Sequence, residues 1–204
     1  MTFKKKENVM LTLASRGAST IPYSNASAYF YNAVAELKRR SQTAKSIIDF
    51  VENRSPSVQI SILVAEIEGA FGPFSLEWAF TGPCIVWAPG KSFTTRGADI
   101  TGYRPSGAPI ISGKRVDVVY PSEIVLLHEI GHAKQYIENP GWFGSQGIGG
   151  AIVAGSKTTI EIQADNLRRH EVPVCKEYGL PQRQNYNDFI QFNPVEMPTT
   201  GRLY

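Results

Sequence analysis

The chain has 204 residues, a formal net charge of +3 and 42% hydrophobic residues, which is enough for one domain with a sizeable core. This composition excludes a disordered chain, and the short basic clusters at 4–6 and 38–40 are typical of solvated faces rather than of a nucleic-acid-binding surface. No apolar run reaches the roughly 18 residues of a membrane-spanning helix. Cys84 and Cys175, paired or free, are too few for an extracellular disulfide framework.

We expect residues 1–20 to form a flexible segment and residues 21–204 to form a single domain. Lys4–Lys6 precede an apolar run at 9–14 that is shorter than the core of a secretory signal peptide. A polar start that carries Ser and Thr suits export by a route without such a peptide. A plain disordered start fits this composition equally well.

The hydrophobic periodicity predicts an α+β fold in which helices and a small sheet precede a long helix. Helices are expected at 25–40, 43–52 and from 121 to about 137, and strands at 58–64, 84–87 and 116–120, with a weaker strand at 109–111. Gly- and Pro-rich turns separate them at 69–75, 88–91 and 102–109.

The most informative motif is H-E-x-x-H at His128, Glu129 and His132, which uses two of the three histidines of the chain. On a helix, residues four positions apart lie on one face, so both imidazoles can reach a single Zn²⁺ ion. The glutamate between them is placed to act as general base toward an attacking water. The motif predicts a zinc hydrolase, most simply a peptidase.

The surrounding sequence supports a helix at this motif. Pro121 suits the first helical position, and Glu123 in the first turn interacts favourably with the helix dipole. The sequence at 139–141, Asn-Pro-Gly, stops the helix. Gly131 inside a helix costs about 1 kcal/mol relative to alanine. A close approach of another backbone would explain why glycine is present there.

The third zinc ligand has to come from elsewhere in the chain. A metzincin would need glycine and histidine where Gln135 and Glu138 stand, so that class is excluded. The gluzincin pattern, a glutamate on a second helix followed four residues later by an aspartate, is present at Glu161 and Asp165.

We therefore expect Glu161 as third ligand and Asp165 as acceptor from the outer N–H group of one histidine. Two alternatives remain open for this segment. Glu161 fits a capping box with Thr158 as N-cap. Asp165 or, less well, Glu171 fits the role of direct ligand.

Further along the chain, Arg183 and Tyr186 are three residues apart and can project toward one cleft. Hydrolysis of a peptide bond builds negative charge on the carbonyl oxygen, and a guanidinium and a phenol are suitable donors to it. A surface loop in which these side chains only pack is the other interpretation.

These residues resemble those of the NleD-type zinc metallopeptidases, effectors that Gram-negative bacteria inject into host cells by type III secretion. The resemblance covers about residues 116–187 and is carried by His128–His132, Glu161, Asp165-Asn166, Arg168, Gly179-Leu180-Pro181, Arg183 and Tyr186. The spacing of Arg183 and Tyr186 is also similar to that in clostridial neurotoxin light chains. The resemblance implies site-specific cleavage of a host protein, with stress-activated MAP kinases as substrates of the best-known member.

Two features of the sequence depart from that family. The first 115 residues carry no motif that matches it, and a segment with six glycines at 141–157 separates the two ligand helices, as either a flap over the cleft or a flexible connection. His170, near the second ligand helix, is expected to be an exposed polar residue.

The expected protein is thus a zincin-like endopeptidase in which His128, His132 and Glu161 bind zinc, Glu129 is the base and Arg183 and Tyr186 stabilise the oxyanion. Its expected location is the host cytoplasm. Two rivals are a zincin-like module that binds a partner without cleaving it, and a zinc exopeptidase or peptidoglycan hydrolase. The oligomeric state is not predicted by any feature of the sequence.

Overall fold

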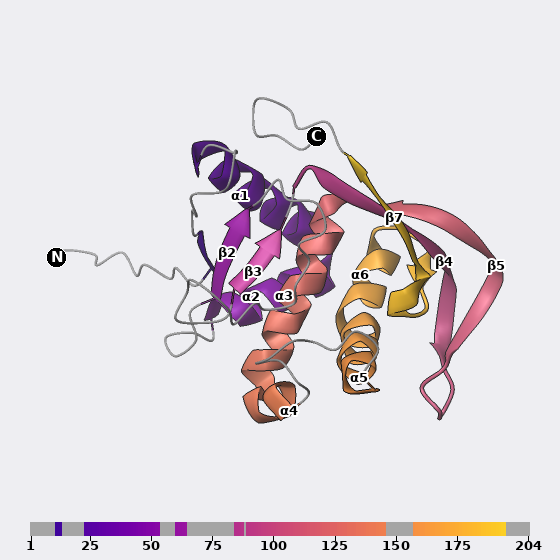
Figure 1. Ribbon diagram of the computed structural model, residues 1–204. Coiled ribbons are helices and arrows are strands. Elements are labelled where there is room, and N and C mark those ends of the chain that lie inside the picture. Colours follow the sequence, from indigo (N-terminus) through magenta and orange to yellow (C-terminus); the bar gives the residue numbers. More distant parts are fainter. Residues whose placement is uncertain are drawn as a thin grey trace.

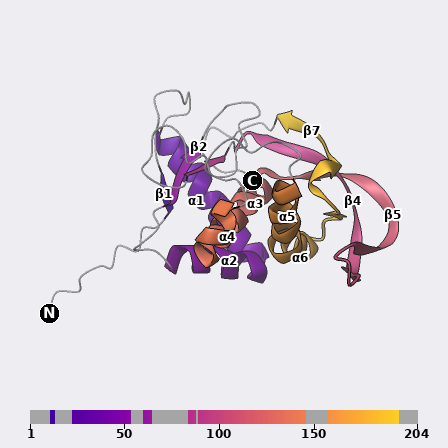
Figure 2. The ribbon, with the colours of Figure 1, turned by 60° about the horizontal axis from the view of Figure 1, so that its bottom comes forward.

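The computed structural model describes residues 11–13, 23–53, 60–64, 84–87, 89–145 and 157–194. The fold is α+β, and helix α3 (Ser122–Glu138) runs through its middle (Figure 1). A parallel sheet with helices α1 and α2 lies on one side of α3, and helices α5 and α6 with an antiparallel sheet lie on the other (Figure 2). The H-E-x-x-H motif is therefore held between two layers.

The first layer contains the parallel sheet and two helices. Its elements are β1 (Leu11–Leu13), β2 (Ile60–Val64), β3 (Cys84–Trp87), α1 (Tyr23–Arg40) and α2 (Gln42–Asn53), with strand order β1-β2-β3. Leu37 and Ile48 are buried in one core with Trp87. The Trp87 indole also donates to the Ser122 carbonyl at 2.8 Å, which ties the start of α3 to this layer.

The second layer contains an antiparallel sheet around one long strand. Its strands are β4 (Lys91–Tyr103), β5 (Pro109–Tyr120), β6 (Gln182–Arg183) and β7 (Phe189–Pro194); β5 lies on one side of β4, and β6 and β7 also pair with β4. Strand β4 is absent from the sequence expectations because few of its residues are apolar and it contains Gly97 and Gly102. The strands expected at 109–111 and 116–120 are two parts of β5.

The segment after α3 supplies the remaining helices and turns, among them α5 and η1, whose side chains contact the motif. They are α4 (Pro140–Ser145), α5 (Lys157–Asn166), the π-helical turn η1 (Leu167–Glu171), α6 (Val172–Glu177) and the 3₁₀ turn η2 (Tyr186–Asp188). Residues 146–156, between α4 and α5, lie outside the described residues. The flap or flexible connection expected at 141–157 falls mostly on these residues.

The expected helices and strands agree with the structure in their places, with small shifts at their ends. Pro121 is the N-cap of α3 rather than its first helical residue, and Asn139 ends the helix as expected. Leu11–Leu13 forms strand β1 inside the segment expected to be flexible, and the rest of 1–20 is outside the described part of the chain. Cys175 is free and buried.

Within the described residues, no helix has the length and apolar character needed to cross a membrane.

A glycine in β4 allows the backbone of β6 to approach closely. A Cβ atom at Gly97 would lie 2.8 Å from the carbonyl oxygen of Pro181, whereas one at Gly102 would meet only the Ile110 side chain at 3.9 Å. The Gly97 contact is with backbone, which cannot rotate away. The register Gly97↔Arg183 therefore depends on glycine at this position.

We predict that Gly97→Ala lowers the free energy of unfolding by about 1–3 kcal/mol, because β6 must move away from β4. The matched control is Gly102→Ala in the same strand, expected to change stability by less than about 0.5 kcal/mol. Urea denaturation followed by tryptophan fluorescence measures both. Equal effects of the two substitutions would contradict the close-approach explanation.

Candidate metal centre

Helix α3 places several polar side chains in the interior of the protein. Thirteen of its residues are buried, and these include Glu123, His128, Glu129, His132 and Gln135. Burying such groups is costly unless each is hydrogen-bonded or bound to an ion. The partners of these side chains therefore define the site.

Three acceptor atoms converge beside the middle of α3. The Nε2 atoms of His128 and His132 are 3.2 Å apart, and the Oε1 atom of Gln163 on α5 lies 3.0 Å from the first and 3.2 Å from the second. A tetrahedral zinc ion with bonds of roughly 2.0–2.1 Å needs donor atoms about 3.3–3.4 Å apart. The three atoms have almost this spacing.

The outer ring nitrogens decide which atoms of the histidines face this point. His128 Nδ1 lies 2.8 Å from the Glu171 carboxylate, and His132 Nδ1 lies 2.7 Å from the side-chain oxygen of Gln135. The nearest partner of each Nδ1 is an acceptor, so each Nδ1 donates, and the Nε2 atom of a neutral ring then turns its lone pair toward Gln163. Burial, with His128 nearby, holds the pKa of His132 well below its usual range, which favours this neutral form.

Three lone pairs that face one another repel unless a cation lies among them, so the donor set fits a bound metal ion. The set differs from common zinc sites in its third member, because an amide oxygen is neutral and binds divalent zinc more weakly than a carboxylate. Among the described residues, no group of three or more His, Cys, Asp and Glu side chains is arranged to hold a metal.

The expected third ligand, Glu161, is not at this point. Its side chain is exposed on α5, whereas Gln163 is 6% exposed and faces the two histidines. Residues two positions apart on a helix are rotated by about 200°, so Glu161 and Gln163 cannot both face α3. We therefore revise the third donor from Glu161 to Gln163.

Asp165 also has a different position from the expected one. It accepts at 2.8 Å from the amide nitrogen of Gln135, whose oxygen in turn accepts from His132. Asp165 thus supports one histidine through an intermediate, and the direct acceptors of the outer N–H groups are Gln135 and Glu171. Glu171, rather than Asp165, meets His128 because the π turn at Leu167–Glu171 brings its carboxylate to the ring.

Glu171 and Arg183 form a fully buried ion pair behind His128. The Arg183 guanidinium donates two hydrogen bonds of 2.6 Å to the carboxylate, one to each oxygen, and Glu171 and Arg183 are 0% and 4% exposed. Burial alone would raise the pKa of Glu171, but Arg183 and His128 outweigh it and hold the pKa at about 2. The carboxylate therefore stays charged and fixes both neighbours.

Glu129 is the ionisable group of the motif with the fewest partners. It is 5% exposed, and its Oε2 atom has no hydrogen-bond partner among the described residues. Burial raises its pKa to about 7, although His128 and the positively charged Arg183 oppose the shift. A carboxyl group with this pKa can both take up and release a proton near neutral pH.

Tyr186 lies beside the same site and is partly exposed. The Tyr186 ring centroid is 6.1 Å from the His128 ring centroid and 5.4 Å from the guanidinium carbon of Arg183. Its side chain is 44% exposed, and its pKa is raised by burial of the hydroxyl and by Glu129. The phenol is thus a protonated donor at neutral pH, beside the group expected to act as base.

Gly131 is explained by a side chain rather than by a backbone. A Cβ atom there would lie 2.2 Å from Asn166 Oδ1 and 3.0 Å from His170 Nδ1. The Asn166 amide donates to the His128 carbonyl at 2.9 Å and accepts from His170 at 2.8 Å. His170 is 2% exposed, contrary to the expectation of an exposed residue.

The sequence expectations missed Gln163 as a donor and Gln135 as the partner of His132. They included Asn166 only through the family resemblance and Glu171 only as an alternative direct ligand, not as the partner of His128. Gln135 follows His132 by three residues, which places both side chains on one face. The π turn hides the indication for Glu171, because helical spacing of 3.6 residues does not apply there.

Comparison of the chain with protein-family models, with curated proteins and with solved structures gives no match.

We predict that Glu171→Gln lowers the free energy of unfolding by about 3–5 kcal/mol at pH 7, because Arg183 is left as an unpaired buried charge. A carboxyl group with a folded pKa of about 2 and an ordinary pKa of 4.5 stabilises the fold above pH 4.5. That stabilisation is lost as the pH falls from 4.5 toward 2. The variant should lack this part of the pH dependence.

Chemical denaturation between pH 3 and 7 (roughly the range in which the carboxyl titrates on unfolding) measures the effect. The control is Glu36→Gln, which removes an exposed pair with Arg39 and should cost less than about 1 kcal/mol. A Glu171→Gln protein as stable as the parent would contradict the structural role of the buried pair.

Proposed function

We propose that this protein is a zinc-dependent peptidase that hydrolyses peptide bonds at the site on α3. The observation that carries the proposal is the convergence of His128 Nε2, His132 Nε2 and Gln163 Oε1 at 3.0–3.2 Å with their lone pairs directed inward. This arrangement supports a zincin-like active site. It modifies the expected donor set, because Gln163 replaces Glu161.

When bound, zinc would act as a Lewis acid that polarises the scissile carbonyl and lowers the pKa of a coordinated water. His128, His132 and Gln163 would hold the ion. Glu171 and Gln135 would fix the orientation of the two imidazole rings by accepting their outer N–H groups, which also increases the basicity of the rings.

Glu129 is the residue proposed to move the proton. Its pKa of about 7 allows it to take a proton from the attacking water and to deliver that proton to the departing amine. The absence of a hydrogen-bond partner at its Oε2 atom, among the described residues, leaves this oxygen available to the water.

Arg183 and Tyr186 are proposed to stabilise the oxyanion. The Tyr186 hydroxyl, protonated at neutral pH, can donate to the carbonyl oxygen as negative charge develops there. Arg183 is held by Glu171 with its Nη2 atom 3.2 Å from His128 Nδ1, so it places positive charge beside the metal site in a fixed position. Their positions differ, because the Tyr186 side chain is partly exposed and the Arg183 side chain is buried.

An endopeptidase is favoured over an exopeptidase by the sheet. Strand β5 is at an edge of the antiparallel sheet as far as the structure describes it, and Ile110, Val116 and Val119 on it are exposed. Such an edge can bind an extended peptide as an added strand. By the resemblance to injected effectors, we further propose that the substrate is a host protein and that the enzyme acts in the host cytoplasm.

One observation favours a second candidate function, a non-catalytic binding module. The third donor is a neutral amide, and a rotated amide would instead donate N–H groups to the two histidine nitrogens and complete a hydrogen-bonded cluster without metal. Metal binding by the purified protein separates the two functions.

We predict that the protein binds one zinc ion and that Gln163→Ala weakens zinc binding by at least about tenfold, because one of the donors is lost. Gln163→Glu should strengthen zinc binding, since a carboxylate adds charge to the same position. Glu161→Gln is the matched control on the same helix and should leave zinc binding unchanged. Competition with a fluorescent chelator measures the affinities.

Loss of zinc affinity in Glu161→Gln with no effect of Gln163→Ala would restore Glu161 as the ligand. No zinc binding by the parent protein after reconstitution would support the non-catalytic module and remove the peptidase proposal.

We predict that Glu129→Gln reduces peptide cleavage by about 10²-fold or more while zinc binding stays within about twofold of the parent, because the general base is lost but the donors remain. New protein N-termini in a eukaryotic cell lysate, identified by mass spectrometry after incubation with parent or variant, measure cleavage without a known substrate. The same N-termini at the same rate with both proteins would show that Glu129 is not the base.

A further inference from the structure

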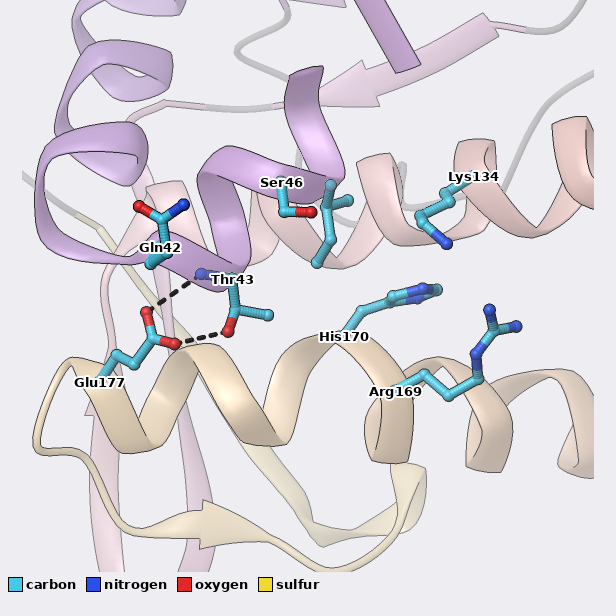
Figure 3. Close-up of a pocket in the computed structure, with 8 residues that line it drawn as sticks. Gln42, Thr43, Ser46, Lys134, Arg169, His170 and Glu177 are labelled. Atoms are coloured by element: carbon cyan, nitrogen blue, oxygen red, sulfur yellow. Dashed lines mark hydrogen bonds between the residues drawn. The ribbon is translucent and has the colours of Figure 1, made fainter. Parts of the chain in front are cut away.

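A pocket separate from the candidate metal site lies between α2, α3 and the η1–α6 segment (Figure 3). Its volume is about 450 Å³, and the residues that line it include Ser46, Lys134, Arg169, His170 and Glu177. The metal donors His128, His132 and Gln163 do not line it, and no role in the proposed peptidase involves it.

His170 contributes an unsatisfied polar atom to this pocket. The side chain is 2% exposed, and its Nε2 atom has no hydrogen-bond partner among the described residues. The other ring nitrogen, Nδ1, lies 2.8 Å from Asn166 Oδ1, which is an acceptor because the Asn166 nitrogen donates to the His128 carbonyl. Nδ1 therefore carries the hydrogen, and Nε2 of the neutral ring is an acceptor that lacks a donor.

Two cationic side chains line the same pocket as this acceptor. Lys134 and Arg169 line the pocket and share the carboxylate of Glu138, and Arg169 also donates to Asp165 at 3.3 Å. An ammonium has three N–H groups and a guanidinium has five, so both retain hydrogens for a further acceptor. The Glu177 carboxylate is turned to the backbone and hydroxyl of Thr43 (Figure 3), which satisfies its oxygens within the wall.

The pocket therefore combines donors on charged groups with one buried acceptor. A fully ionised anion such as sulfate satisfies the donors but has no hydrogen for His170. Inorganic phosphate near pH 7 has anionic oxygens for Lys134 and Arg169 and always retains a P–OH group that can donate to an imidazole. We propose that this pocket binds inorganic phosphate, with Lys134 and Arg169 on its oxygens and its P–OH hydrogen on His170 Nε2.

The same chemistry extends to a phosphate monoester that keeps one proton, and the pocket volume leaves room for a small organic group. A monoester loses its last P–OH hydrogen near pH 6, whereas inorganic phosphate does not, so inorganic phosphate is the ligand expected at neutral pH. The proposal does not depend on the peptidase, because none of its residues would hold zinc.

Isothermal titration of the full-length protein at pH 7, with a chelator present so that bound metal cannot capture the anion, tests the proposal. We expect saturable phosphate binding, and sulfate binding at least about tenfold weaker because His170 would remain without a donor. Phenyl phosphate should bind more weakly than inorganic phosphate at pH 7 and approach it at pH 5.5, roughly where it regains a proton.

Substitutions identify the pocket. Arg169→Gln should weaken phosphate binding at least about tenfold, since a charged donor is lost, and Arg168→Gln, the adjacent exposed arginine that also pairs with Asp165, should have less than about a twofold effect. Glu138→Gln should strengthen binding, because it removes a carboxylate that competes for Lys134 and Arg169. His170→Phe should reduce the preference for phosphate over sulfate.

Three results would overturn the proposal: no phosphate binding by the parent protein, equal effects of Arg169→Gln and Arg168→Gln, or sulfate binding as tight as phosphate binding. Arg168 and Arg169 are on the exposed side of the segment, so their substitution should not prevent folding. Their variants therefore still test the proposal if His170→Phe fails to fold. A protein that binds phosphate but not zinc would refute the peptidase and leave this inference in place.

Discussion

The structure depends on one constraint: helix α3 is buried on nearly all sides and yet carries ionisable side chains along its length. A buried polar group is tolerated only when a partner satisfies it, so the elements around α3 are selected by what they supply. Gln135 supplies an acceptor from within the helix, Glu171 and Asn166 supply partners from the opposite segment, and Arg183 neutralises Glu171 from the sheet. The side chains that surround the histidines are therefore those that satisfy the buried polar groups of α3.

The π-helical turn between α5 and α6 is the element that makes this solution possible. An α-helix turns 100° per residue, so on a regular helix Asn166 and His170 would share a face, about 40° apart, whereas Glu171 would lie about 140° from Asn166. The wider turn at Leu167–Glu171 keeps all three on the side that meets α3. Glu171 then faces the candidate metal site and His170 faces the pocket proposed to bind phosphate, with Asn166 between them.

The α+β class, the positions of α1, α2 and α3, and the strands β2, β3 and β5 were predictable from hydrophobic periodicity. Strand β4, the centre of the antiparallel sheet, was not, because its burial comes from pairing with β5, β6 and β7 rather than from a run of apolar residues. The candidate site divides in the same way. His128, Glu129 and His132 follow from local spacing, whereas the third donor depends on which face of α5 is turned toward α3.

The sequence by itself determined that two histidines would stand one turn apart on a helix, with a glutamate directly after the first, because residues four positions apart lie on one face of any α-helix. It also brought Arg183 and Tyr186 into consideration through their chemistry. Only the tertiary structure decided that Gln163 rather than Glu161 meets the histidines, that Glu171 rather than Asp165 orients His128, and that His170 is buried. The physical reason is that helical phase and the packing of two segments select among neighbouring polar residues whose local patterns are equivalent.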